Sequence, residues 1–479
     1  MSTPADEALP PSGELWRLDA VSLSERLASE EITPVHLLDM YLERCDRLEP
    51  KLSAFAVLDR AGAAAAAKDA TERQKSGQRR GPLDGVPVAI KDNLFVAGLP
   101  AEWGSRMFKG FFPERDDICV ERLRTAGAVI IGKTTTPEFA LSGRTENSVT
   151  GTTRNPWDTN LTPGGSSGGA VAAVAAGMVP LAIGTDAGGS TRMPASYTGL
   201  VGLRPSNGYI PRCYGFPPMA VDFQAIGVIT RTMRDLELLL GAVAGPDIRD
   251  PVSMHVILPR RQGKPQRLGW FTSVGDVSAS SDVIASHADT LLHLESLGYT
   301  IEKCPPPFDL NEIREIWGTL TSVGAARTAR RLGDKWKALA TDQIAGLVER
   351  GLAVPAATYV DTLDRLQGFR SKTSANWGDF DALVLPSNPI PAWPVESEHP
   401  IEIDGKPVSP DAQGVFCGWV NAMGYAGLSI PGRPSPDGRP IGIQLVAPAG
   451  TDAVIIDIAR RLEQAMPWRD RWPPLASTA

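Results

Sequence analysis

The chain has 479 residues, of which 42% are hydrophobic and 22% charged, a composition typical of globular proteins with a large core. Its net charge of −7, without a long run of lysine or arginine, argues against binding to nucleic acid or to an anionic membrane. The N-terminal segment lacks the basic and apolar regions of a signal peptide. No apolar run reaches the ~20 residues of a membrane helix. We therefore expect a cytoplasmic protein.

The cysteines are scattered and form no CxxC pair. Their odd number argues against a disulfide framework, so reduced thiols are the simplest interpretation. The five are Cys45, Cys119, Cys213, Cys304 and Cys417.

The first half of the chain alternates helices with short apolar strands. Thr33 and Pro34 are typical of a helix start, and apolar residues with helical spacing follow them. Further helices are predicted over 61–75, 118–125 and 170–176, and buried strands over 86–90, 128–131 and 180–183. This alternation predicts an α/β protein with a central mixed, mostly parallel twisted sheet that is covered by helices on both faces.

The second half interrupts this pattern and then returns to it. Strands are predicted over 268–273, 299–304, 380–386 and 441–446, and helices over 281–297 and 452–464, with a mostly helical, charge-rich stretch over 310–370. We expect one domain over residues 1–479. Its parts are an N-terminal helical segment (1–78), a core (80–235), a variable and mostly helical covering region (245–375) and a C-terminal return to the core sheet (376–470).

Two serines lie in glycine-rich segments on either side of a predicted helix and strand. Residues 164–169 read GGSSGG and include Ser166, and residues 184–190 read GTDAGGS and end in Ser190. A phosphate-binding loop would need a Gly-Lys-Ser/Thr ending, and a nucleophile elbow would need G-x-S-x-G; neither is present. Glycines around a serine let backbone N–H groups converge on one point, which favours acyl-transfer chemistry.

A serine nucleophile needs a base, and the usual base is histidine. No sequence signal links any histidine to the serines, and His287 and His293 fall on a predicted surface helix. Lys91 is the alternative, because it follows the buried strand 86–90. A lysine base must be neutral, and burial can lower the pKa of lysine enough to make it so. The histidines are His36, His255, His287, His293 and His399.

With these residues in place, the sequence resembles the amidase signature family of Ser–Ser–Lys hydrolases. The matching motifs are GVP at 85–87, IKDN at 90–93, TRNPW at 153–157, PGGSSGG at 163–169 and GTDAGGS at 184–190. Arg192, Pro194, Ala195, Gly199, Gly202, Arg204 and Pro205 fit the same pattern. The resemblance covers about residues 20–465 and is strongest over 80–235.

The resemblance implies a catalytic triad. Ser190 would be the nucleophile, Ser166 a bridging serine held by a cis peptide bond with Gly165, and Lys91 the terminal base. It implies hydrolysis of carboxylic amides through an acyl-enzyme, with aryl amides, esters and carbamates (urethanes) as further candidate substrates. No metal or organic cofactor is expected.

The resemblance also implies supporting roles around the triad. The oxyanion hole would be formed by the backbone N–H groups of Ala187, Gly188, Gly189 and Ser190. Asp186 and Arg192 would brace that loop, and Ala140 and Ser142 would line the substrate pocket. Tryptophans such as Trp377, Trp393 and Trp419 could form an aromatic pocket, although core packing is the simpler role for each.

The chain departs from the family pattern at three places after the nucleophile, one of which is the segment 424–431, a loose version of the usual C-terminal pattern. Thr191 stands where isoleucine is usual, and Arg204-Pro205-Ser206 stands where Lys-Pro-Thr is common. These departures leave the triad positions intact. Together with the weak match over 245–375, they favour a stand-alone hydrolase of small-molecule amides, esters or carbamates, as a monomer or homodimer.

Two alternatives remain at this point. The chain could be the glutamine-hydrolysing amidase subunit of a tRNA-dependent amidotransferase complex, which would pass ammonia to a partner subunit. It could also be a binding scaffold without catalysis, although the intact Lys91, Ser166 and Ser190 argue against that.

Overall fold

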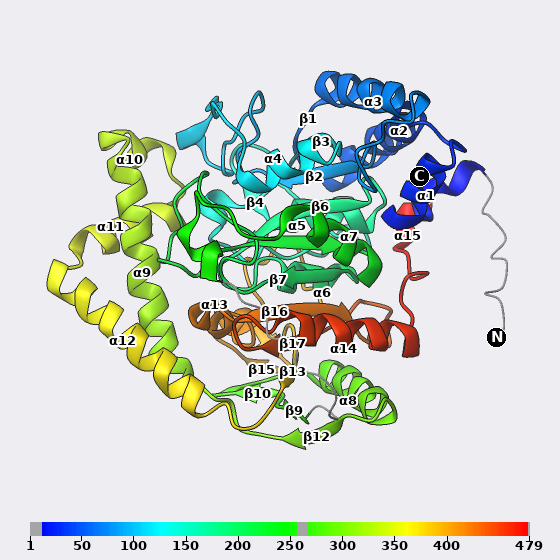
Figure 1. The fold of residues 1–479 in the computed structure, drawn as a ribbon. Helices are drawn as coiled ribbons and strands as arrows, with labels where there is room; N and C mark the ends of the chain where they lie inside the picture. Colours follow the sequence, from blue (N-terminus) through cyan, green and yellow to red (C-terminus); the bar gives the residue numbers. More distant parts are fainter. Residues whose placement is uncertain (1–11, 256–266, 478–479) are drawn as a thin grey trace.

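The computed structural model describes residues 12–255 and 267–477, and its centre is an eleven-stranded sheet (Figure 1). The strand order is β1-β3-β2-β6-β8-β7-β16-β17-β13-β9-β12. The strands are β1 (Phe55–Leu58), β2 (Pro87–Lys91), β3 (Val129–Thr134), β6 (Leu181–Asp186), β7 (Val201–Arg204), β8 (Ala225–Thr230), β9 (Arg267–Trp270), β12 (Thr300–Lys303), β13 (Ala382–Pro386), β16 (Ala426–Pro431) and β17 (Gly442–Ala447). Three two-stranded ribbons accompany them: β4 (Glu146–Asn147) with β5 (Gly151–Thr152), β10 (Ser273–Val274) with β11 (Val277–Ser278), and β14 (Glu402–Ile403) with β15 (Lys406–Pro407).

The helices surround this sheet and include all those that the sequence predicts, together with others that it does not (Figure 1). They are α1 (Ala20–Ala28), α2 (Pro34–Leu52), α3 (Arg60–Lys75), α4 (Ile118–Thr125), α5 (Gly168–Ala175), α6 (Arg192–Thr198), α7 (Met233–Val243), α8 (Ser281–Ser296), α9 (Leu310–Arg330), α10 (Trp336–Leu339), α11 (Asp342–Ala353), α12 (Ala356–Ala375), α13 (Gly418–Met423), α14 (Asp452–Ala465) and α15 (Pro474–Ser477). Thr33 is the N-cap of α2, and its side chain accepts a hydrogen bond from the backbone of His36, as the Thr-Pro start predicts.

The sheet is mixed, as predicted, but its parallel pairs are confined to two regions. Parallel ladders join β2 to β3 and to β6 near one end, and β9 to β12 and to β13 near the other. The remaining six ladders are antiparallel. Parallel pairing is therefore less extensive than the alternation of helices and strands suggested, because the middle of the sheet contains strands that this alternation does not reveal.

Alternate residues of the central strands pack against different helices, which gives the sheet two covered faces. Val88 and Ile90 of β2 belong to a core that includes residues of α1, α4, α7 and α14. Ala89, between them, belongs to a second core that includes residues of α2, α3 and α5. This alternation confirms the prediction of helices on both faces.

Helix α5 is buried along its whole length, since it consists only of glycine, alanine and valine. At Gly169 a Cβ atom would lie 2.4 Å from the backbone oxygen of Ala54 and 2.4 Å from the backbone nitrogen of Thr135. A larger residue there would push the helix away from the strands. The glycines of the GGSSGG segment therefore let the start of α5 approach the sheet closely.

Helices α9 to α12 form the helical region predicted over 310–370 and lie to one side of the sheet (Figure 1). Helix α9 packs against both α11 and α12.

The boundaries expected within the single domain, at residues 78–80, 235–245 and 375–376, stay predictions. Within the described ranges, no helix is both long and apolar enough to cross a membrane. All five cysteines are free thiols, and Cys213 is the exposed one.

Candidate active site

Lys91 is the last residue of β2, and its side chain is fully buried. Strand β2 runs parallel to β6, with Ile90 opposite Ile183, so the carboxyl ends of both strands meet at one edge of the sheet. Clefts at such edges are where α/β proteins commonly bind ligands. The register therefore brings Lys91 next to the glycine-rich segment that follows β6.

The amine of Lys91 lies among hydroxyl groups. Its Nζ is 2.8 Å from Oγ of Ser166, 3.0 Å from Oγ of Ser167 and 3.1 Å from Oγ1 of Thr185. The side-chain amide of Asn93 donates a hydrogen bond of 2.9 Å to the same Thr185 hydroxyl. Burial lowers the pKa of Lys91 to about 7, against a smaller opposing effect of the negative charge of Asp186.

A second buried lysine, Lys133, has a counter-ion, which Lys91 lacks. Lys133, on the neighbouring strand β3, is also fully buried, but its amine forms an ion pair of 3.4 Å with Asp92. Within the described residues, Lys91 has no carboxylate at ion-pair distance. A buried amine without a counter-ion is favoured in its neutral form, which is the form that can accept a proton.

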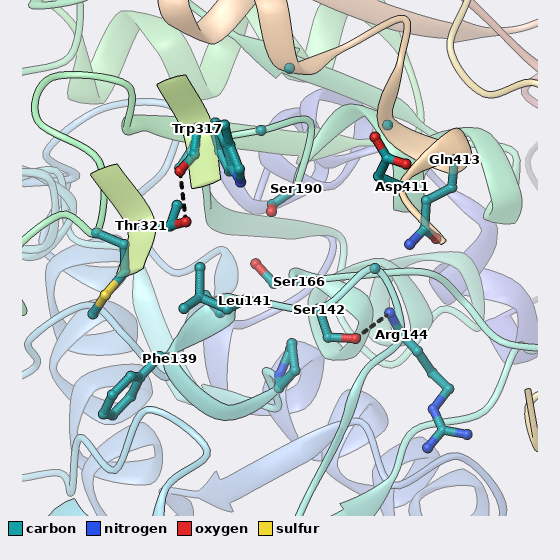
Figure 2. A pocket seen from close by; sticks show the side chains of 18 of the residues that line it. Phe139, Leu141, Ser142, Arg144, Ser166, Ser190, Trp317, Thr321, Asp411 and Gln413 are labelled. Carbon is teal, nitrogen blue, oxygen red and sulfur yellow. Dashed lines mark hydrogen bonds between the residues drawn. The ribbon is translucent and has the colours of Figure 1, made fainter. Parts of the chain in front are cut away.

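Ser166 is buried just before α5, and the peptide bond between Gly165 and Ser166 is cis. Ser190 lies in the loop between β6 and α6 and is half-buried. The backbone N–H of Ser167 donates a hydrogen bond of 3.1 Å to the carbonyl of Ser190, which ties the two serine segments together. Figure 2 shows the Ser166 and Ser190 side chains facing the same central space.

The loop that carries Ser190 folds around the carboxylate of Asp186. That carboxylate accepts hydrogen bonds from the backbone N–H groups of Gly189, at 2.7 Å, and Thr191, at 3.0 Å. Gly189 has a φ of 111°, and a Cβ atom there would lie 2.6 Å from Cβ of Cys417, so glycine is needed both for its backbone angle and for the close approach. Among the residues that the structure describes, no acceptor contacts the N–H groups of Ala187, Gly188 or Ser190.

Arg192 forms a buried ion pair with Asp186. Its Nε and Nη2 donate to the two carboxylate oxygens at 3.0 and 2.9 Å. Burial by itself raises the pKa of Asp186, but the charge of Arg192 and its hydrogen bonds outweigh this effect and hold the pKa below its ordinary value. Gln444, Asn421 and the carbonyl of Cys417 accept the remaining guanidinium hydrogen bonds, so the whole group is satisfied inside the protein.

The two serines open into a cavity of about 1210 Å³ between the sheet edge and α9. Both predicted pocket residues, Ala140 and Ser142, line it. The apolar lining includes Phe139, Leu141, Met193, Met219, Ile313, Trp317, Val415 and Trp419. Figure 2 shows Trp317 on the same side of the space as Ser190, with Ser166 below them.

Several residues of the site carried no signal in the sequence. Ser167 and Thr185 adjoin predicted site residues, but only the fold shows that they contact the Lys91 amine. Trp317 belongs to α9, where apolar residues that face a cavity look like residues that face the core.

The three tryptophans considered for an aromatic pocket have different positions. Trp419 lines the cavity. Trp377 and Trp393 are buried in packed cores away from the cavity lining. Core packing is therefore the role of these two, and only Trp419 borders the space in front of the serines.

The structure shows no hydrogen bond between either serine and the side chains of His36, His287, His293 or His399. His287, expected on a surface helix, is buried, and its Nε2 lies 2.9 Å from the carbonyl oxygen of Val384. Burial lowers the pKa of His287 to about 4. His399 lines the cavity, and its ring contacts the carbonyl of Pro400. The described residues contain no cluster of three histidine, cysteine, aspartate or glutamate side chains suited to a metal ion.

Comparison with known proteins places this chain in a family. The model of the amidase family matches residues 36–456. The acylamidase of Rhodococcus erythropolis is 32% identical, over 95% of this chain and 97% of that protein. One of the subunits of the glutamyl-tRNA(Gln) amidotransferase of a Cyanothece species is also 32% identical, over 95% of this chain and 99% of that protein. The solved structure of 6-aminohexanoate cyclic dimer hydrolase with its substrate matches with a TM-score of 0.82 and 28% identity, over 96% of this chain and 100% of that chain.

The fold and these matches define an enzyme, a hydrolase that acts on C–N bonds outside peptides. The chain belongs to the amidase family, which confirms the resemblance drawn from its motifs.

Proposed function

We propose that the protein is a stand-alone hydrolase of carboxylic amides that works through an acyl-enzyme on Ser190. The observation that carries this proposal is the buried contact of 2.8 Å between Lys91 and Ser166, beside a cavity that also exposes Ser190. Lys91 is the base, Ser166 passes protons, and Ser190 attacks the substrate.

The proposed hydrolysis consumes only the amide and one water molecule. The hydroxyl oxygen of Ser190 bonds to the amide carbon while its proton moves to Ser166, whose own proton moves to Lys91. The tetrahedral intermediate collapses, the C–N bond breaks, and the proton returns through Ser166 to the leaving nitrogen. Water then attacks the ester on Ser190 by the same proton path and releases the carboxylic acid.

The hydroxyl groups around Lys91 direct its lone pair. A neutral amine has two N–H groups and one lone pair. Ser167 donates its own proton toward the carbonyl of Thr185, at 3.3 Å, so its oxygen is free to accept from Lys91. The Thr185 hydroxyl, already receiving the amide of Asn93, accepts the second N–H. The lone pair then points to Ser166, the nearest of the three hydroxyls.

The loop after β6 supplies the donors for the negative oxygen of the intermediate. Three of the four predicted N–H groups, those of Ala187, Gly188 and Ser190, are available for it, while that of Gly189 is bonded to Asp186. Removing one such donor costs roughly 3–4 kcal/mol of transition-state stabilisation in known enzymes. The ion pair of Asp186 with Arg192 supports the loop that presents these donors.

The charges of the cavity argue against glutamine as the substrate, and so against the role of an amidotransferase component. The lining contains five carboxylates and two arginines, Arg144 and Arg314. Arg144 is paired with Glu146, and Arg314 with Asp411. The α-carboxylate of glutamine would find no unpaired arginine or lysine in this lining. Neutral amides fit better, and aryl amides, esters and carbamates are included in the proposal.

A substrate panel tests the proposal. Wild-type protein, purified without partners, is incubated with glutamine, an aliphatic amide, an anilide, an aryl ester and an aryl carbamate, and Ser190→Ala serves as the control. We expect turnover of neutral amides and none of glutamine, with every activity lost in Ser190→Ala. Glutaminase activity in the absence of neutral-amide turnover would overturn the proposal.

A further inference from the structure

The wall of the cavity beside Ser190 contains an aromatic ring placed directly on the proposed oxyanion loop. A Cβ atom on Gly188 would lie 2.7 Å from Cη2 of Trp317, so the indole of Trp317 occupies the space that glycine leaves free. The ring also packs on Phe223, with centroids 5.5 Å apart. Trp317 is thus held in place and still lines the cavity (Figure 2).

Gln224 lies beside the same loop. In the antiparallel ladder Asp186 pairs with Ala225, so the next register position sets Gln224 beside Ala187. Gln224 lines the cavity, and no residue in the described ranges forms a hydrogen bond with its side-chain amide. Its neighbour Phe223 is anchored, because the Phe223 carbonyl accepts hydrogen bonds from Asn421 and Arg204.

Part of the cavity lining is apolar. Phe139, Leu141 and Met219 belong to or pack against one hydrophobic cluster that borders the cavity. Together with Trp317, they give the cavity an apolar part, and Gln224 adds N–H donors and a carbonyl acceptor to the lining. Pockets of this kind bind apolar groups and use a few polar atoms to orient them.

We propose that Trp317 and Gln224 form a specificity wall that selects substrates with a planar, uncharged aryl group next to the scissile amide. The aryl ring stacks on the indole of Trp317, and Gln224 forms a hydrogen bond with a polar substituent of that ring. This inference rests on the proposed function and narrows its substrate class to aryl amides.

The role of Trp317 is tested with acetanilide and propionamide, which share an amide but differ in the aryl ring. Trp317→Leu removes the ring, and Trp317→Phe keeps an aromatic surface. We expect Trp317→Leu to raise KM for acetanilide about threefold to tenfold, in line with the loss of an aromatic pair, and Trp317→Phe to raise it less. KM for propionamide should change by less than about twofold. Equal changes for both substrates would overturn this part of the inference.

The role of Gln224 is tested by comparing 4-hydroxyacetanilide with acetanilide. Gln224→Leu keeps a similar size and removes both hydrogen-bonding atoms. We expect it to lower the ratio of kcat/KM for the two substrates about threefold or more, as the loss of one hydrogen bond predicts. The matched control is Gln343→Leu, because Gln343 also lines the cavity but donates to the carbonyl of Leu141. An unchanged ratio in Gln224→Leu, or an equal fall in Gln343→Leu, would overturn the assignment.

Failure of the inference and failure of the proposed function give different results. If wild-type protein hydrolyses neither acetanilide nor propionamide, the proposed function fails. If it hydrolyses propionamide and not acetanilide, or if the substitutions leave the preference for the aryl substrate unchanged, the specificity wall alone is wrong.

Discussion

The amine of Lys91 lies 2.8 Å from the hydroxyl of Ser166 and, in the part of the chain that the structure describes, has no carboxylate partner. This relationship links sequence to mechanism. The end of a buried strand places the amine, burial lowers its pKa to about 7 so that the neutral form is well populated near neutral pH, and the cis-linked Ser166 lies between it and the cavity.

The pH dependence of the reaction should follow the titration of Lys91. Its pKa is lowered to about 7 by burial, and the protonated amine cannot accept a proton. We therefore expect kcat/KM for an amide to fall about tenfold per pH unit well below pH 7 and to level off above it. The measurement is a profile of kcat/KM between pH 5 and pH 9, and a flat profile across that range would contradict a lysine base of this kind.

Loss of the base should affect substrates according to their leaving groups. Lys91→Ala removes the group that returns a proton to the leaving nitrogen, which amides need and activated esters do not. We expect kcat/KM to fall at least about 100-fold more for acetanilide than for 4-nitrophenyl acetate. Circular dichroism of the variant verifies folding. Equal losses for both substrates would count against the proton path through Ser166.

The hydroxyl of Thr185 should matter through the orientation of Lys91. Thr185→Val keeps the volume and removes the acceptor of one amine N–H, whereas Thr185→Ser retains it. We expect kcat for an amide to fall about tenfold in Thr185→Val, with little change in KM, and to recover in Thr185→Ser. If Thr185→Val keeps full kcat, the lone pair of Lys91 is oriented by other contacts.

The pair of Asp186 and Arg192 should be important for stability as well as for loop geometry. Arg192→Met would leave a buried carboxylate uncompensated, which costs about 3–5 kcal/mol of unfolding free energy. Arg60→Met is the matched control, because Arg60 pairs with Asp46 at the exposed surface, where a pair is worth less than about 1 kcal/mol. Urea denaturation measures both. Similar decreases in the free energy of unfolding of the two variants would show that the buried pair stabilises the protein no more than the exposed pair does.

Much of the fold was predictable because its longer helices and several of its strands have clear periodicity and clear ends, although the edge strand β1 was missed. The helix over 118–125 is α4 to the residue, and Lys91 was recognised because it ends an apolar strand. The central strands β7, β8 and β16 were not predicted. They are short apolar or glycine-containing segments, and periodicity does not distinguish such segments from loops or buried helix.

Besides Lys91, the site residues that could be predicted from the sequence itself are those that lie in glycine-rich segments. Ser166 and Ser190 stand in glycine clusters, so their chemistry could be argued from the sequence. The wall formed by Trp317 and Gln224 depends on a register between two strands and on the packing of α9, which are long-range relationships. No local sequence pattern indicates such relationships, and only the folded chain brings Trp317 to Gly188 and Gln224 to Ala187.

The central claim is that Ser190 carries the acyl group, and trapping that group tests it most directly. Wild-type protein is mixed with 4-nitrophenyl acetate, quenched in acid within the first turnovers, digested and analysed by fragmentation mass spectrometry, with Ser190→Ala treated in parallel. We predict one acetyl group on Ser190 in the wild type and none at that peptide in the variant. An acetyl group on Ser166, or on any residue that persists in Ser190→Ala, would contradict the account.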